Sequence, residues 1–164
     1  MNFKILLLSY FLTFGYLTEF NAQNLTEYSE NLNTASELYL NGKKIPDSIL
    51  KKIVPSNYNE FEIYYRTTET GHRLSETDFF YDTSQLIFDR VISKNKSEFY
   101  LPSLRLSSFA DGEYAEYFIE NLELIIEMDE QKFCKSIKGK DYSKRNPIKH
   151  YSELKNCVFS SLLN

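Results

Sequence analysis

Five glutamates form the sharpest pattern of chemically active side chains in this sequence. They recur at spacings of three and four residues, so a helix over 112–128 would carry all of them on one face. The five are Glu113, Glu116, Glu120, Glu123 and Glu127. No lysine or arginine lies between Asp111 and Glu130. Because like charges four residues apart cost a helix roughly 0.2–0.5 kcal/mol per pair, this acidic face suggests a surface that contacts a basic partner or holds cations.

Two other interpretations of the acidic face require no partner. One is a plain solvated helix surface. The other is internal pairing with residues 131–164, which contain eight basic side chains and two acidic ones. Exposed pairs of that kind would stabilise the fold little. Metal binding is less favoured, because glutamates on a helix lack the compact loop of oxygen ligands that calcium sites use. We therefore expect neither a metal nor a cofactor, and we suspect a protein partner.

His72 is a weak candidate for acid–base chemistry. It lies in the polar segment 67–77, close in sequence to Glu69 and Glu76. A histidine beside carboxylates can act as a base, although an exposed loop histidine without a catalytic role is more common. The chain has no glycine-rich phosphate loop and no HExxH, GxSxG or CxxC motif. We expect a protein that is not an enzyme; the alternatives are an envelope hydrolase using His72 and nearby carboxylates, or a purely structural envelope protein.

Cys134 and Cys157 are the two cysteines of the chain. An even pair in an oxidising compartment indicates a disulfide, which would stabilise the fold by roughly 3 kcal/mol in the chain-entropy model. A thiolate metal site would need further ligands at suitable spacing. The remaining alternative, a Cys–His pair, depends on His150, which precedes Cys157 in the same predicted helix.

The N-terminal residues predict export. A lysine precedes the apolar run 5–17, which is shorter than the roughly 20 residues of a membrane-spanning helix. We therefore predict a signal peptide over 1–22 and a single domain over 23–164. The junction Ala22–Gln23 resembles the signal-peptide ends of some exported proteins of Gram-negative bacteria. These features predict a periplasmic or secreted protein without a transmembrane segment in its mature chain.

Composition excludes several broad classes. The aromatic content of 16%, with 13 tyrosines and 13 phenylalanines, is too high for a disordered chain. A formal net charge of −4 argues against nucleic-acid binding, which needs a basic surface. Tyrosine is favoured at interfaces, so the tyrosines could form a recognition surface. Most of them lie at core spacing, and we expect those to pack inside.

The elements that must position these residues are helices. Apolar spacing predicts an all-α array of about six or seven short helices with short connections. Residues 57–70 fit a helix or a strand, and the flanking helices favour the helix. Among the other predicted helices, the first begins with an Asn24–Glu27 capping box and the second covers 46–53. Three more start near Asp82, follow Ser97 and span 112–128, and a short one carries Phe133 and Ile137. The last helix starts at Pro147 and has Tyr151, Leu154, Val158 and Leu162 on one side.

Overall fold

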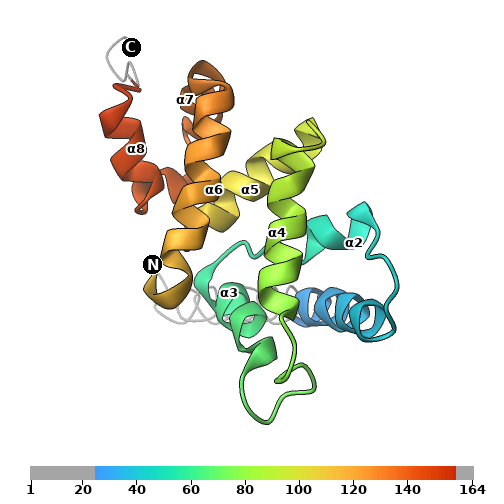
Figure 1. Cartoon of the computed structure of the whole chain (residues 1–164). Helices are drawn as coiled ribbons and strands as arrows, with labels where there is room; N and C mark the ends of the chain where they lie inside the picture. Colours follow the sequence, from blue (N-terminus) through green and yellow to red (C-terminus); the bar gives the residue numbers. More distant parts are fainter. Residues whose placement is uncertain (1–24, 158–164) are drawn as a thin grey trace, which may run out of the picture.

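The computed structural model describes residues 25–157, and within that range it contains helices and no β-strand (Figure 1). The first helical segment covers 25–40. It is followed by α2 (Asp47–Lys52), α3 (Tyr58–Tyr65), α4 (Phe79–Ile92), α5 (Tyr100–Ser107), α6 (Ala115–Met128), α7 (Glu130–Ile137) and α8 (Ile148–Leu154). Short 3-10 turns are η1 (Arg66–Thr68), η2 (Ser97–Phe99), η3 (Gly112–Tyr114) and η4 (Asp141–Lys144). The all-α prediction is confirmed, with eight α-helices in the described range rather than six or seven.

Helices α4, α5 and α6 pack against one another at the centre of the array (Figure 1). Residues 25–40, α2 and α3 gather around α4, whereas α7 and α8 lie beyond α6 (Figure 1). The segment 57–70 forms α3, followed by η1, so the helical interpretation was the correct one. Its start is fixed by Asn57, whose side chain accepts a hydrogen bond from the Glu60 amide.

Aromatic side chains dominate the core where α3, α4 and α6 meet. Phe61 stacks on Phe109 with ring centroids 4.8 Å apart, and the Phe80 and Phe118 rings lie 6.0 Å apart. Burying each such ring contributes up to about 3 kcal/mol. The first helix also turns one side to the core, because its Tyr28, Leu32 and Ala35 are buried. The phenylalanines of the described range are all buried, so packing explains them.

Helix α4 begins earlier than the sequence pattern indicated. Asp82 was expected near its start, but the helix begins at Phe79 and Asp82 lies in its first turn. Phe79 and Phe80 are both fully buried, so the helix extends to place this aromatic pair in the core. The Asp82 carboxylate instead accepts a hydrogen bond of 2.5 Å from the Tyr39 hydroxyl.

The last helix also differs from expectation. Helix α8 ends at Leu154, and Leu154 is 59% exposed rather than turned inward. Ile148 and Ser152 are its buried residues. Beyond the helix, the Cys157 amide donates to the Ser152 carbonyl at 2.8 Å. Cys157 thus follows α8 instead of lying within it.

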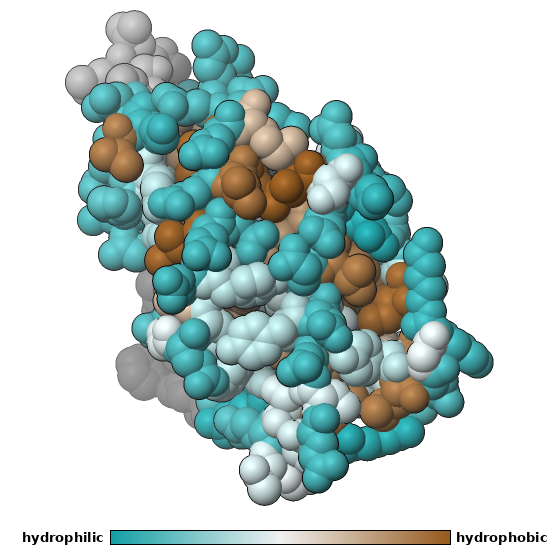
Figure 2. All heavy atoms as spheres, in the orientation of Figure 1, coloured by the Kyte–Doolittle hydropathy of each residue, from teal (hydrophilic) through white to brown (hydrophobic). Residues whose placement is uncertain are grey.

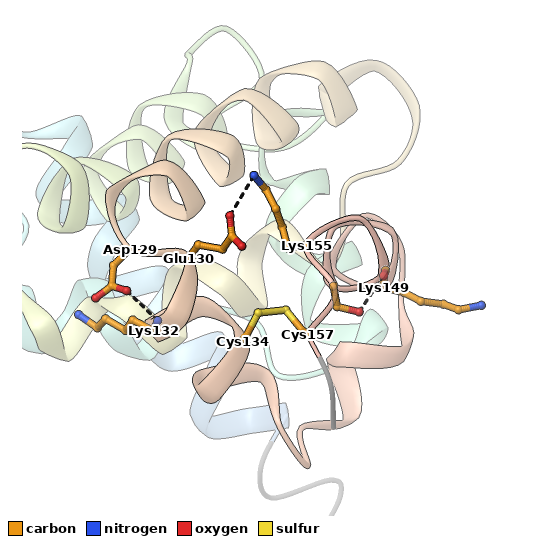
Figure 3. Close-up of a disulfide and its surroundings, with 8 residues drawn as sticks. Asp129, Glu130, Lys132, Cys134, Lys149, Lys155 and Cys157 are labelled. Carbon is orange, nitrogen blue, oxygen red and sulfur yellow. Dashed lines mark hydrogen bonds and ion pairs between the residues drawn. A yellow bond between two sulfur atoms is a disulfide. The ribbon is translucent and has the colours of Figure 1, made fainter. Parts of the chain in front are cut away.

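Cys134 on α7 and Cys157 lie at disulfide distance, with their Cα atoms 5.1 Å apart (Figure 3). This confirms the predicted pairing. Beside it, Lys155 forms an ion pair of 3.2 Å with Glu130 (Figure 3). The bridge and the ion pair together hold the end of the described chain against α7.

Several sequence predictions fall outside residues 25–157. They are the signal peptide with its cleavage after Ala22, the Asn24 cap, and the positions of Val158 and Leu162. Within the described range, no helix combines the length and the apolar character needed to span a bilayer.

Candidate functional site

The acidic face predicted from the sequence is a continuous exposed surface of η3 and α6. All five of its glutamates are exposed, while Phe118, Leu122 and Ile125 on the opposite side of the helix are buried. The segment begins where the Asp111 side chain accepts a hydrogen bond of 2.8 Å from the Gly112 amide. The sequence therefore placed the five carboxylates correctly on one solvent-facing surface.

Two of these five carboxylates are held by tyrosines from other helices. The Tyr65 hydroxyl on α3 donates to Glu113 at 2.5 Å, and the Tyr151 hydroxyl on α8 donates to Glu123. The bond to Glu113, with a smaller contribution from burial, raises the pKa of Tyr65 to about 12. Burial, followed by the bond to Glu123, raises the pKa of Tyr151 to about 12. Both tyrosines therefore remain protonated donors at neutral pH.

Glu116, Glu120 and Glu127 have no hydrogen bond or ion pair with any side chain in residues 25–157. The basic C-terminal segment does not neutralise them. Its Lys155 pairs with Glu130, and its Lys149 lies 3.8 Å from Glu153. Internal pairing, one alternative for the acidic face, is thus absent from these three positions in the described chain.

Two apolar residues accompany the carboxylates on the same helix. Leu124 and Met128, one turn apart on α6, are 47% and 49% exposed. Figure 2 shows apolar groups among hydrophilic ones in the region of α5 and α6. This exposed apolar pair was not predicted from the sequence. The available signal was their spacing of four residues, offset from the buried positions Leu122 and Ile126.

A cluster of tyrosines adjoins the N-terminal end of the acidic face. We call Tyr65, Tyr81, Tyr114 and Tyr117 the tyrosine cluster; they come from α3, α4, η3 and α6. The rings of Tyr65 and Tyr114 are 5.0 Å apart, and those of Tyr81 and Tyr117 are 6.0 Å apart. Burial and then the charge of Glu113 raise the pKa of Tyr81. Figure 2 shows pale rings gathered over α4 and α6. These rings and the carboxylates together form a surface suited to cationic side chains.

His72 is exposed, and its recorded hydrogen bonds are made by its backbone to Glu69 and Ser75. The neighbouring Arg73 pairs with Glu37 across the surface. The second histidine, His150, is also exposed and lies against the Tyr151 ring, while Cys157 is bonded to Cys134. These positions give no support to a histidine-based catalytic site. Among residues 25–157, no group of three or more His, Cys, Asp or Glu side chains is arranged to hold a metal ion.

The cavities lined by described residues include three of note. One of about 920 Å³ lies between residues 25–40, α2 and α3. A second, of about 460 Å³, is lined by Lys43, Lys44 and Lys94 among others, and a third, of about 680 Å³, lies along α8. His72 lines none of the three.

No family model, curated protein or solved structure matches the chain. The acidic face with the adjoining tyrosine cluster is the candidate functional site.

Proposed function

We propose that this protein is an exported binding protein, whose acidic face and tyrosine cluster engage a basic protein partner. The observation that carries the proposal is the set of three exposed carboxylates, Glu116, Glu120 and Glu127, that no described side chain neutralises. The specific form we favour is an inhibitor or immunity-type protein that neutralises a basic exported enzyme, such as a cell-wall hydrolase.

The composition of the surface supports a protein partner over a small cation. Unpaired carboxylates steer a basic partner toward the surface and set its orientation, but contribute less to affinity. Affinity in such interfaces comes mainly from a few aromatic and apolar contacts that become buried. Tyr81, Leu124 and Met128 are exposed large side chains that can supply those contacts.

The predicted compartment also supports this proposal. A disulfide such as Cys134–Cys157 persists in oxidising compartments and is rare in the cytosol. The leader predicted over 1–22 would direct the chain to the periplasm or the exterior. Basic hydrolases that act on the cell wall work in that same space.

Affinity capture followed by a charge-variant series tests the proposal. The disulfide-bonded domain, immobilised, is incubated with native envelope extract, and a retained protein is identified and purified. Its Kd is then measured at low and physiological salt. We expect the triple variant Glu116→Gln, Glu120→Gln, Glu127→Gln to raise the Kd by at least about tenfold and to flatten its salt dependence.

The matched control neutralises three exposed carboxylates elsewhere: Glu30→Gln, Glu76→Gln, Glu98→Gln. It changes net charge equally, so it separates the acidic face from overall charge. If both triple variants weakened partner binding equally, net charge alone would explain the effect. That result would contradict the proposal. Retention of acidic partners only, or of none, would also contradict it.

A further inference from the structure

The largest of the three cavities has an unusual charge arrangement. It is formed by residues 25–40, the end of α2, the start of α3 and Arg105 from α5. Both carboxylates on its wall are already engaged. Glu27 lies 3.8 Å from Lys52, and Glu60 accepts hydrogen bonds from the Ser56 amide and the Asn57 side chain. Lys51 and Arg105, which also line the cavity, have no ion pair among the described residues.

Arg105 is the one arginine in the lining of this cavity. One of its terminal nitrogens donates to the Val54 carbonyl at 3.1 Å, whereas its Nε is buried and has no hydrogen-bond partner among the described residues. Burial lowers the pKa of Arg105, with the nearby Glu60 opposing that shift. A partly buried guanidinium without an ion pair is costly, so an anion held against its accessible part would relieve the cost.

A second guanidinium adjoins the same wall. Arg145 stacks on the ring of Tyr58, a cavity residue, at 5.1 Å from the ring centroid, and its Nη1 is also buried without a partner. The Tyr142 hydroxyl is a third buried polar group without a hydrogen-bond partner, and Tyr142 and Arg105 influence each other's pKa. Buried polar atoms without partners are rare in native proteins and commonly mark a bound water or ion. Of these three residues, Arg105 lines the cavity whereas Arg145 and Tyr142 lie outside its lining, so Arg105 is the group that a ligand in the cavity would complete.

The remaining walls favour an organic ligand over a bare ion. Leu25, Tyr28 and Val54 add apolar surface, and the Tyr58 ring is 59% exposed. A volume of about 920 Å³ is within the range of small-molecule sites, about 300–1,000 Å³, and far exceeds the size of a phosphate ion. Polar groups that fix one end and aromatic groups that cover the other are the usual composition of such sites.

We propose that this cavity binds a small organic anion, a carboxylic acid or phosphate ester with an apolar or aromatic part. Its anionic group pairs with the Arg105 guanidinium in the cavity wall, Lys51 supplies a second positive charge, and Tyr58 covers the apolar part. This site is independent of the acidic face, so neither proposal requires the other.

Nuclear magnetic resonance titration of the disulfide-bonded protein tests the site. The probes are phenyl phosphate, benzoate, inorganic phosphate and neutral benzyl alcohol. We expect saturable shifts of the Arg105 Nε–H signal with the two aromatic anions, weaker binding of inorganic phosphate and no saturable binding of benzyl alcohol. The tighter of phenyl phosphate and benzoate identifies the anionic group as a phosphate ester or a carboxylate.

Two variants complete the test. Arg105→Gln should raise the Kd by at least about tenfold, because a hydrogen bond to a charged group is lost. Lys51→Gln should raise it by a smaller factor with the fold intact, and this variant remains informative if Arg105→Gln unfolds. Lys135→Gln, at an exposed position of α7, is the charge-matched control. Absence of saturable binding, equal binding of benzyl alcohol, or a Kd unchanged in both cavity variants would overturn the proposal.

Discussion

The hydroxyl of Tyr65 donates a 2.5 Å hydrogen bond to the carboxylate of Glu113, 48 residues further along the chain. This contact joins α3 to η3, where the acidic face begins. Because the Tyr65 ring also lies 5.0 Å from that of Tyr114, one residue connects the acidic face to the tyrosine cluster. The two parts of the candidate site are therefore held together by the same packing that orders the fold.

Tyr65→Phe tests this connection. The variant keeps the ring and removes the donor to Glu113, so we expect a loss of about 0.5–1 kcal/mol in the free energy of unfolding, the low end for an exposed hydrogen bond. Urea denaturation measures it. The control is Tyr58→Phe, because the Tyr58 hydroxyl makes no recorded hydrogen bond among the described residues. Equal losses in the two variants would show that the bond to Glu113 contributes nothing specific.

The tyrosines predict a defined response to alkaline pH. Burial raises the pKa of Tyr64 to about 12, and Tyr65 and Tyr151 also reach about 12. Since these values lie above the unfolded value of about 10, the stability they contribute is fully present below pH 10. It is lost as pH rises from 10 through 12. Absorbance titration near 295 nm should show a native transition displaced upward from that of the urea-unfolded chain; coincident transitions would contradict this.

Asp47 should make the folded protein less stable at acid pH, the opposite end of the pH range from the tyrosines. It links α2 to the C-terminal end of α4, accepting a 2.8 Å hydrogen bond from the buried Arg90 and a second bond from Lys96. These two bonds, Lys96 first, hold the pKa of Asp47 below its usual value. A depressed folded-state pKa gives stability that is present above about pH 4 and lost as pH falls below it.

The variant Asp47→Asn should lower the free energy of unfolding at pH 7 by about 1–3 kcal/mol, since Arg90 then lacks its charged partner. It should also reduce the change in stability between pH 5 and pH 3. The control is Asp141→Asn, at an exposed position with no recorded side-chain contact. Acid denaturation curves that coincide for wild type and Asp47→Asn would refute the assignment.

The disulfide predicts a stability change that can be measured in two ways. Reduction, or the double variant Cys134→Ser, Cys157→Ser, should lower the free energy of unfolding by about 3 kcal/mol, because the bridge closes a loop with a sequence separation of 23. The oxidised protein should be two hydrogens lighter than the reduced form by mass measurement. Two free thiols in protein purified under non-reducing conditions would contradict the assignment.

The sequence predicted what depends on local spacing. The five glutamates share a face because their spacing matches the helical period, and Cys134 and Cys157 could be paired by elimination. It missed what depends on contacts between distant elements. Tyrosines at core spacing were expected to pack inside, but the packing of α3 against η3 brings the rings of Tyr65 and Tyr114 together beside Glu113, where both are only partly buried.

The same reason explains the missed cavity and the misplaced helix boundaries. No sequence pattern singled out Arg105, and its position beside Tyr28 and Glu60 follows only from how α5 packs near residues 25–40 and α3. Helix α4 starts at Phe79 because the core needs two buried aromatic rings, which overrides the capping preference of Asp82. Tertiary packing decided both.

Leu124 and Met128 give the sharpest test of the binding surface. Both are exposed on α6, so changing them to glutamine should alter the free energy of unfolding by no more than about 0.5 kcal/mol. If the acidic face binds a partner, the same double variant should raise the partner's Kd by at least about tenfold, because buried apolar contacts dominate affinity in such interfaces. Leu154→Gln on α8, where Leu154 is 59% exposed, is the control for losing a surface leucine. An unchanged Kd in the double variant would restrict the interface to the carboxylates and the tyrosine cluster. If Leu154→Gln weakened partner binding equally, the contact would lie outside the acidic face.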